Sequence, residues 1–164
     1  MAVFDLIGSS AQFRALLDNV NMVNAPLIAR ERNIEVSEVK HSRPGNFQTL
    51  IRLTVTTEQQ SRAVAGTLFG GGKPRLVEIK GIAIEAELGR RMLYVTNRDK
   101  PGFIGRLGTL LGDAGINIAT FHLGRTAPGA DAIALIEIDE PLGEDILARI
   151  RALPDVVQAS ALSF

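Results

Sequence analysis

The chain of 164 residues contains no cysteine, and aromatic residues make up only 5% of it. Without cysteine it has no disulfide, no thiol nucleophile and no cysteine-based zinc site. Its 18 basic and 18 acidic residues balance, which argues against a general binder of phosphate backbones. No window reaches the roughly 18 apolar residues of a membrane span, and the N-terminus lacks the features of a signal peptide. We therefore expect a soluble, cytoplasmic protein that binds small molecules or proteins, and neither nucleic acid nor membranes.

The first half of the chain predicts a helix followed by an antiparallel sheet. Residues 1–19 form a leader or the remnant of a preceding domain. Apolar residues at helical spacing follow and are interrupted by Pro26, so a helix begins or restarts near Asn24. Short alternating segments separated by glycine, proline and polar runs then predict strands at 34–42, 47–57, 61–70, 75–80 and 82–88. We assign residues 20–90 to this first domain, because Glu87–Arg91 is polar and contains a glycine.

Residues 91–164 have a clearer order. A strand at 92–97 precedes an apolar helical stripe from Phe103 to Ala114, which Gly115 ends as a C′ residue. Two further strands, a helix stopped by Pro154 and a last strand follow, at 116–125, 132–139, 146–153 and 156–162. The order βαββαβ is that of the ferredoxin-like unit, with strand order 4-1-3-2. The fold class is therefore α+β: a helix-on-antiparallel-sheet domain followed by a ferredoxin-like βαββαβ domain.

Residues typical of catalysis are scarce. The glycine-rich run Gly66–Arg75 departs from the spacing of a phosphate-binding P-loop. Lys73 and Arg75 in it are either an anion site, with glycine N–H groups, or the solvated charges of a glycine-rich hairpin. His41 and His122 are far apart in sequence and have no accompanying acid pattern. We predict no catalytic residue and no metal site.

The stretch "NRDKPGFIGRLGTLLGDAGINIATF" suggests a binding site for an amino acid. Gly102 allows a close approach of the backbone, and the helix N-terminus behind it offers N–H donors to a carboxylate. Asp99 either caps that helix or accepts an ammonium group. Asn117, which opens the next strand, offers both a donor and an acceptor. The predicted effector-binding set is Asn97, Asp99, Gly102, Phe103, Ile104, Asn117 and Ile118.

Two stretches carry a resemblance to known families. "NRDKPGFIGRLGTLLGDAGINIATFHLGR", followed by "GADAIALIEID", resembles an ACT domain, a regulatory module that binds amino acids between two paired copies. Upstream, "VNMVNAPLIARERNIEVSE" and "AVAGTLFGGGKPRLVEIKG" are similar to the intervening, or allosteric substrate-binding, domain of long-form D-3-phosphoglycerate dehydrogenases. The resemblance covers the chain from about Val20 to Phe164 and implies the C-terminal regulatory region of such an enzyme.

The resemblance also implies a ligand and an assembly. The family serves L-serine biosynthesis and oxidises 3-phosphoglycerate with NAD in a Rossmann domain, so no cofactor is expected in this chain. In the family, the ligand L-serine binds between two ACT domains and is held by residues whose matching positions here are Asn97, Asp99 and Asn117. L-serine or another small amino acid is thus the implied ligand, bound by a homodimer or a tetramer that forms through the ACT domains. Arg75 matches one anion-binding position of some relatives. At a second such position, this chain has Glu87 in place of their cation.

Two alternatives remain open at this point. The chain is an assembly module that pairs subunits without binding an amino acid, or it is the regulatory part of an iron–sulfur L-serine dehydratase. The dehydratase interpretation calls for a Ser-Ser-Ser-His-Thr-like run, whereas this chain has "GSSAQF". The predicted strand "INIATFHLGR" has apolar residues on both faces and an exposed edge, which favours pairing with a second copy.

Overall fold

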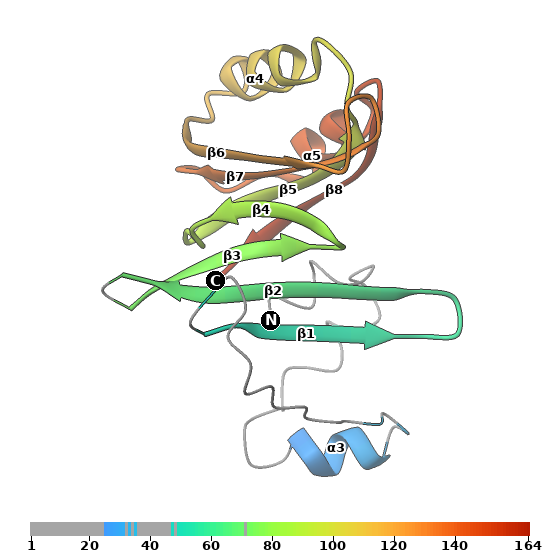
Figure 1. Cartoon of the computed structure of the whole chain (residues 1–164). Helices are drawn as coiled ribbons and strands as arrows, with labels where there is room; N and C mark the ends of the chain where they lie inside the picture. Colours follow the sequence, from blue (N-terminus) through green and yellow to red (C-terminus); the bar gives the residue numbers. More distant parts are fainter. Residues whose placement is uncertain (1–24, 32, 34, 36–46, 48, 71) are drawn as a thin grey trace.

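The computed structural model describes residues 25–31, 33, 35, 47, 49–70 and 72–164 (Figure 1). Helix α3 (Ala25–Glu31) begins next to Asn24, which confirms that helix start. The leader at 1–19, most of the preceding helical stripe and nearly all of the strand predicted at 34–42 lie outside the described residues.

The first sheet is an antiparallel meander of four strands in the order β1-β2-β3-β4. The strands are β1 (Ile51–Thr56), β2 (Ser61–Phe69), β3 (Lys73–Ile79) and β4 (Ile82–Ala86). They confirm the four alternating segments predicted between 47 and 88. Lys80 and Gly81 form the tight turn between β3 and β4, with positive φ angles of 52° and 79°. Such a turn suits glycine, whereas a lysine seldom adopts this left-handed conformation.

The second sheet has the order β6-β7-β5-β8, and all its neighbouring strands are antiparallel. Counted from β5, this is the predicted order 4-1-3-2, and the α+β fold class is confirmed. The elements are β5 (Arg91–Arg98), α4 (Phe103–Asp113), β6 (Ile118–Arg125), β7 (Asp131–Ile138), α5 (Glu144–Arg151) and β8 (Val156–Ser163). Gly115 has a φ of 71° just after α4, as expected of the residue that ends a helix.

The second sheet is buried on both faces. Helices α4 and α5 cover one face (Figure 1), and their core includes Leu93, Leu107, Leu111, Ile136 and Ile150. The other face packs against the first sheet in one continuous apolar cluster. That shared core comprises Val64, Leu76, Ile79, Ile82, Ile84, Ala86, Met92, Tyr94, Ile133, Leu135 and Leu162. The alternation along β5 therefore serves two cores, one on each side of the strand.

Close contact between the sheets requires a glycine on β6. A Cβ atom added at Gly124 would lie 2.9 Å from Ile82 Cγ2 and closer than 3.0 Å to the carbonyl oxygen of Ala83. Because the Ala83 oxygen belongs to the backbone of β4, it cannot rotate out of the way. The missing side chain at Gly124 thus allows β4 to lie directly on β6.

Candidate functional site

The second-last residue of strand β5 is a buried asparagine. Asn97 is only 3% exposed, and its Nδ2 donates to the carbonyl oxygen of Arg98 at 2.8 Å. Its Oδ1 is buried and has no hydrogen-bond partner among the described residues. The pairing of β5 with β8 shifts register between Thr96 and Asn97, so that Val157 on β8 has no partner there. This irregularity places Asn97 at the point where the sheet opens into the next loop.

The N-terminus of α4 is capped by backbone geometry alone. Its N-cap residue is Gly102, with a φ of 87° and no side-chain capping hydrogen bond. The prediction that Asp99 could cap this helix is therefore wrong. The N–H of Asp99 donates to the carbonyl oxygen of Ala130 at 2.8 Å, which holds this loop on the β6–β7 hairpin instead of on α4. Phe103 is buried below the helix start, and Ile104 is 51% exposed.

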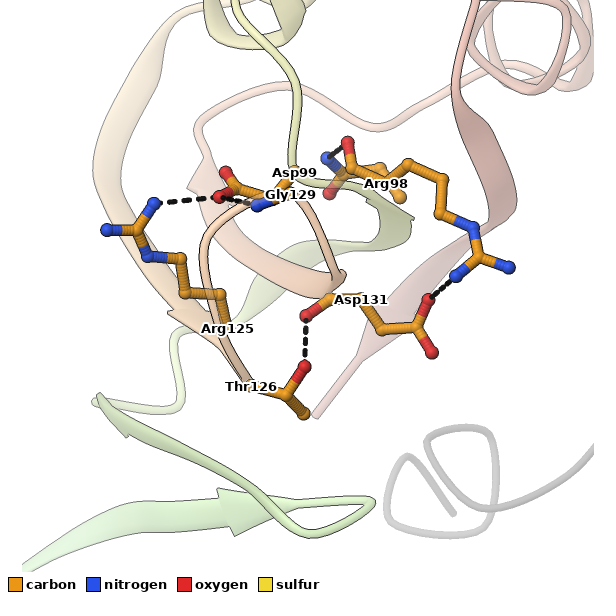
Figure 2. A network of polar contacts seen from close by, with 7 residues as sticks. Arg98, Asp99, Arg125, Thr126, Gly129 and Asp131 are labelled. Carbon is orange, nitrogen blue, oxygen red and sulfur yellow. Dashed lines mark hydrogen bonds and ion pairs between the residues drawn. The ribbon is translucent and has the colours of Figure 1, made fainter.

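Asp99 binds the hairpin with its carboxylate as well (Figure 2). Its Oδ2 accepts a hydrogen bond from Arg125 Nη1 at 2.7 Å and a second one from the N–H of Gly129 at 3.1 Å. The Arg125 hydrogen bond and then that of Gly129 hold the pKa of Asp99 below its usual value. A carboxylate that receives donors is stabilised in its ionised form, so Asp99 carries its charge at neutral pH.

Asn117 lies at the opposite end of the second sheet. Its Nδ2 donates to Asp139 Oδ2 at 2.6 Å, and its N–H donates to Glu140 Oε2 at 2.8 Å. On β7 the partner of Asn97 is Ala132, whereas Ile138 pairs with Ile118 next to Asn117. Six residues of strand separate these positions, which is about 20 Å. Within one chain, the structure therefore does not bring Asn117 to Asn97 and Asp99.

The remaining predicted residues fall into two places. Ile118 packs against the core under the helices. Lys73 opens β3, directly opposite Phe69 in a hairpin, and Arg75 forms an ion pair with Glu87. These contacts favour the interpretation of the glycine-rich run as a hairpin over its interpretation as an anion site. An anion would have to compete with Glu87 for Arg75.

Sequence reasoning missed the residues that contact the predicted set. Arg125 and Gly129 bind Asp99, and Asp139 and Glu140 bind Asn117. The turn-rich run "TAPGAD" between two strands was the available signal for the hairpin that carries Gly129. The contact of Gly129 with Asp99 requires that β5 and β6 end on the same side of the sheet, where the β6–β7 turn lies. The strand order 4-1-3-2 already implies this.

A lysine with a lowered pKa joins the two sheets. The Nζ of Lys80 lies 5.3 Å from the ring centroid of Tyr94 on β5 and donates to Gln158 Oε1 on β8 at 3.3 Å. Burial, and then repulsion from Arg62, lower the pKa of Lys80 to about 8. Burial raises the pKa of Tyr94. Lys80 thus connects the β3–β4 turn to two neighbouring strands of the second sheet, β5 and β8.

The described part of the chain contains neither a membrane-spanning helix nor a cluster of metal-binding side chains. No helix there is both long and apolar enough to cross a membrane. In the same residues, no three side chains of histidine, aspartate or glutamate gather where they could hold a metal ion. His122 lies on β6, and its Nε2 is buried without a partner among the described residues, so it is a packed residue of the sheet.

Comparison with known proteins identifies both halves. Residues 8–80 match the family model of the D-3-phosphoglycerate dehydrogenase intervening domain, and residues 91–155 match that of the ACT domain. The chain joins a phosphoglycerate dehydrogenase intervening domain to an ACT domain. The ACT match spans both sequence regions of the predicted effector set, around Asn97 and around Asn117. Regulation of an amino-acid biosynthetic enzyme is the function class to which these two domains belong.

Curated relatives agree with this assignment. The D-3-phosphoglycerate dehydrogenase of Bacillus subtilis is 34% identical over 143 residues, which are 87% of this chain and 27% of the relative. Those of Methanocaldococcus jannaschii and Synechocystis are 30% and 32% identical, over 90% and 89% of this chain. The chain spans little more than a quarter of the length of these relatives.

Proposed function

We propose that this chain is a regulatory region of a cytoplasmic D-3-phosphoglycerate dehydrogenase that binds L-serine between two copies of its ACT domain. The observation that carries the proposal is the separation of Asn117 from Asn97 and Asp99. Among the described residues, strand β6 lies at the edge of the second sheet and pairs only with β7. If two copies pair antiparallel along β6 about a two-fold axis, the start of one β6 lies beside the end of the other. Asn117 of one copy then faces the Asn97–Asp99 loop of its partner.

Charge along β6 supports the antiparallel orientation. The strand ends in the cation Arg125, whereas the carboxylates of Asp139 and Glu140 lie beside its start, around Asn117. A two-fold axis between two copies brings these opposite charges together at both ends of the paired β6 strands. Complementary charges of this kind fix register and orientation more than affinity. A parallel pairing would instead place like charges side by side.

Exposed apolar groups support the same surface. Leu123 on β6 is 48% exposed and Ile104 on α4 is 51% exposed. A free strand edge with apolar residues is a pairing template that a monomer normally protects. A second copy would cover the edge and complete two equivalent binding sites, each built from residues of both chains.

The ligand acts in this proposal through assembly. Because serine binds residues of two chains, it prefers the paired state and shifts the equilibrium towards it by no more than that preference. The shared core and the Lys80 contacts connect the second sheet to the first, so a change in pairing reaches the intervening domain. Oxidation of 3-phosphoglycerate with NAD, the chemistry of the family, is assigned to residues outside this chain.

Complementation between two variants tests the shared site. Asp99→Ala removes the carboxylate of one half-site and Asn117→Ala removes the amide of the other half-site. In a mixed dimer, the intact Asp99 of one chain faces the intact Asn117 of its partner. We expect neither variant alone to give a saturable heat with L-serine, and the refolded mixture to regain up to one site per mixed dimer. Glycine and D-serine are the ligand controls, and light scattering reports the mass.

The outcomes separate the candidate functions. A mixture that stays silent while wild type binds serine would place the whole site within one chain. A stable dimer without serine heat in wild type would favour the assembly module that binds no amino acid. The partners of Asp99 and Asn117 within the chain are the observation that favours this second candidate, since both side chains already have hydrogen bonds.

A further inference from the structure

The β6–β7 hairpin is fastened to the loop after β5 through one residue, Asp99. Three contacts converge there: the Asp99 N–H donates to the Ala130 carbonyl oxygen, and its carboxylate accepts from Arg125 and from the N–H of Gly129. Figure 2 shows Asp99 between Arg125 and Gly129 of the hairpin. Gly129 has a φ of 78°, so its N–H is presented by a backbone conformation that suits glycine. The carboxylate is therefore oriented by the hairpin and not by α4.

Both hairpin donors bind the same carboxylate oxygen. Arg125 and Gly129 donate to Oδ2 of Asp99, which fixes the plane of the carboxylate and directs Oδ1 away from the hairpin. An ion pair between side chains this exposed, 56% for Arg125 and 29% for Asp99, contributes little to folding. Its main physical effect is on the orientation and charge of Asp99.

The other charged groups at this end of the sheet have partners of their own. Arg98 at the end of β5 pairs with Asp131 at the start of β7. Lys100 in the following loop pairs with Asp155, the residue before β8, at 2.7 Å, and Arg106 on α4 lies 3.7 Å from the same carboxylate. Among the described residues, Arg125 is thus the cation that contacts Asp99.

We propose that Arg125 is a positioning residue of the amino-acid site, which holds the Asp99 carboxylate so that Oδ1 accepts the ammonium group of the ligand. The assignment rests on the proposed function, since it needs a ligand whose ammonium group reaches Asp99. Arg125 itself does not touch the ligand. The hairpin then forms a wall of the site, and its sequence affects ligand binding although it lies outside the predicted effector set.

The test compares Arg125→Gln with a matched control at the same end of the second sheet. Arg98→Gln removes an equally exposed arginine from an ion pair with Asp131 and leaves Asp99 untouched. Arg125→Lys is the conservative variant that retains the charge. For each variant of the 164-residue chain, calorimetry measures the dissociation constant of L-serine from pH 3 to pH 8. NMR of the side-chain carboxyl carbons follows the titration of Asp99 without ligand, and light scattering gives the mass.

We expect Arg125→Gln to weaken serine binding about two- to fivefold at pH 7, the range of an exposed pair converted to affinity. The pKa of Asp99 should rise, so the loss of affinity on acidification should begin at a higher pH than in wild type. Arg125→Lys should restore part of both effects, and Arg98→Gln should change neither.

Three results would overturn the assignment. If the Asp99 titration moves but serine affinity and its pH profile do not, Arg125 does not position a binding group, and the proposed function stands. If Arg125→Gln dissociates the dimer and loses serine heat together, Arg125 acts through the charges that pair the two β6 strands and not through Asp99. If wild type gives no serine heat while the Asp99 titration still depends on Arg125, the proposed function has failed and the ion pair is only structural.

Discussion

Gly124 is the position where a single added methyl group tests how the two sheets meet. In the Gly124→Ala variant, the new Cβ would lie closer than 3.0 Å to the Ala83 carbonyl oxygen and 2.9 Å from Ile82 Cγ2. A carbon and a carbonyl oxygen normally stay about 3.3 Å or more apart. The β4 backbone must therefore move away from β6 by several tenths of an ångström. This movement weakens the packing of the shared core between β4 and β7.

The expected cost follows from this displacement. Overpacking by one methyl group in a well-packed core destabilises by about 1 to 3 kcal/mol. For a chain of this size, each kcal/mol lowers the melting temperature by about 2 to 4 °C, so a loss of about 2 to 12 °C is expected. Urea unfolding followed by circular dichroism would measure the free energy of unfolding, with an unchanged slope against urea if only the folded state is affected.

Gly108→Ala is the matched control for Gly124→Ala. A Cβ atom at Gly108, in the middle of α4, would have no atom within 4 Å apart from the neighbouring backbone of α4 itself. Replacing a helical glycine by alanine there should stabilise by about 0.5 to 1 kcal/mol. The two substitutions add the same group and should have opposite signs. If Gly124→Ala is as stable as wild type, β4 does not lie directly on β6, and the two sheets do not share a closely packed core at this point.

Further substitutions test the partly buried Lys80 and the turn before α4. The lowered pKa of Lys80, about 8 against 10.5 in an exposed lysine, means that the unfolded chain binds more protons above pH 8. Stability should therefore rise between pH 8 and 10, by about 1 to 2 kcal/mol since the amine is only partly buried, and Lys80→Met should flatten this rise in urea titrations at each pH. A wild-type curve that is level over this window would contradict the burial of the amine. Gly102→Ala should cost about 1 to 2 kcal/mol because its φ of 87° is left-handed, and a melting temperature equal to that of wild type would show that the turn before α4 relaxes freely.

Local patterns were enough to predict most elements of the fold. Alternation and helical spacing located every described strand between 51 and 163 and both helices of the second domain, and chirality rules gave the order of its sheet. Packing of one sheet on the other was not predictable in this way. An alternating strand shows which residues face inward, as along β5, but not which surface covers each face, because that depends on contacts between residues far apart in sequence.

The predicted site needed more than residue types. Asn97, Asp99 and Asn117 were grouped because each suits an amino-acid ligand, but chain proximity is a poor guide to distance once a helix intervenes. β5 and β6 run in the same direction on either side of β7. The end of β5, with Asn97, and the start of β6, next to Asn117, therefore lie at opposite ends of the strands. The predicted strand order contained this information, and applying it to Asn117 would have shown that one chain cannot complete the site.

The shared core also decides how this chain can be divided. Cutting before Arg91 would leave a ferredoxin-like fragment whose helix-free face displays Met92, Tyr94, Ile133, Leu135 and Leu162, all at most 3% exposed in the intact chain. Such a continuous apolar surface promotes aggregation in water. A fragment for biophysical work should therefore start before β3. It then includes β3 and β4, which cover the helix-free face of the ACT domain.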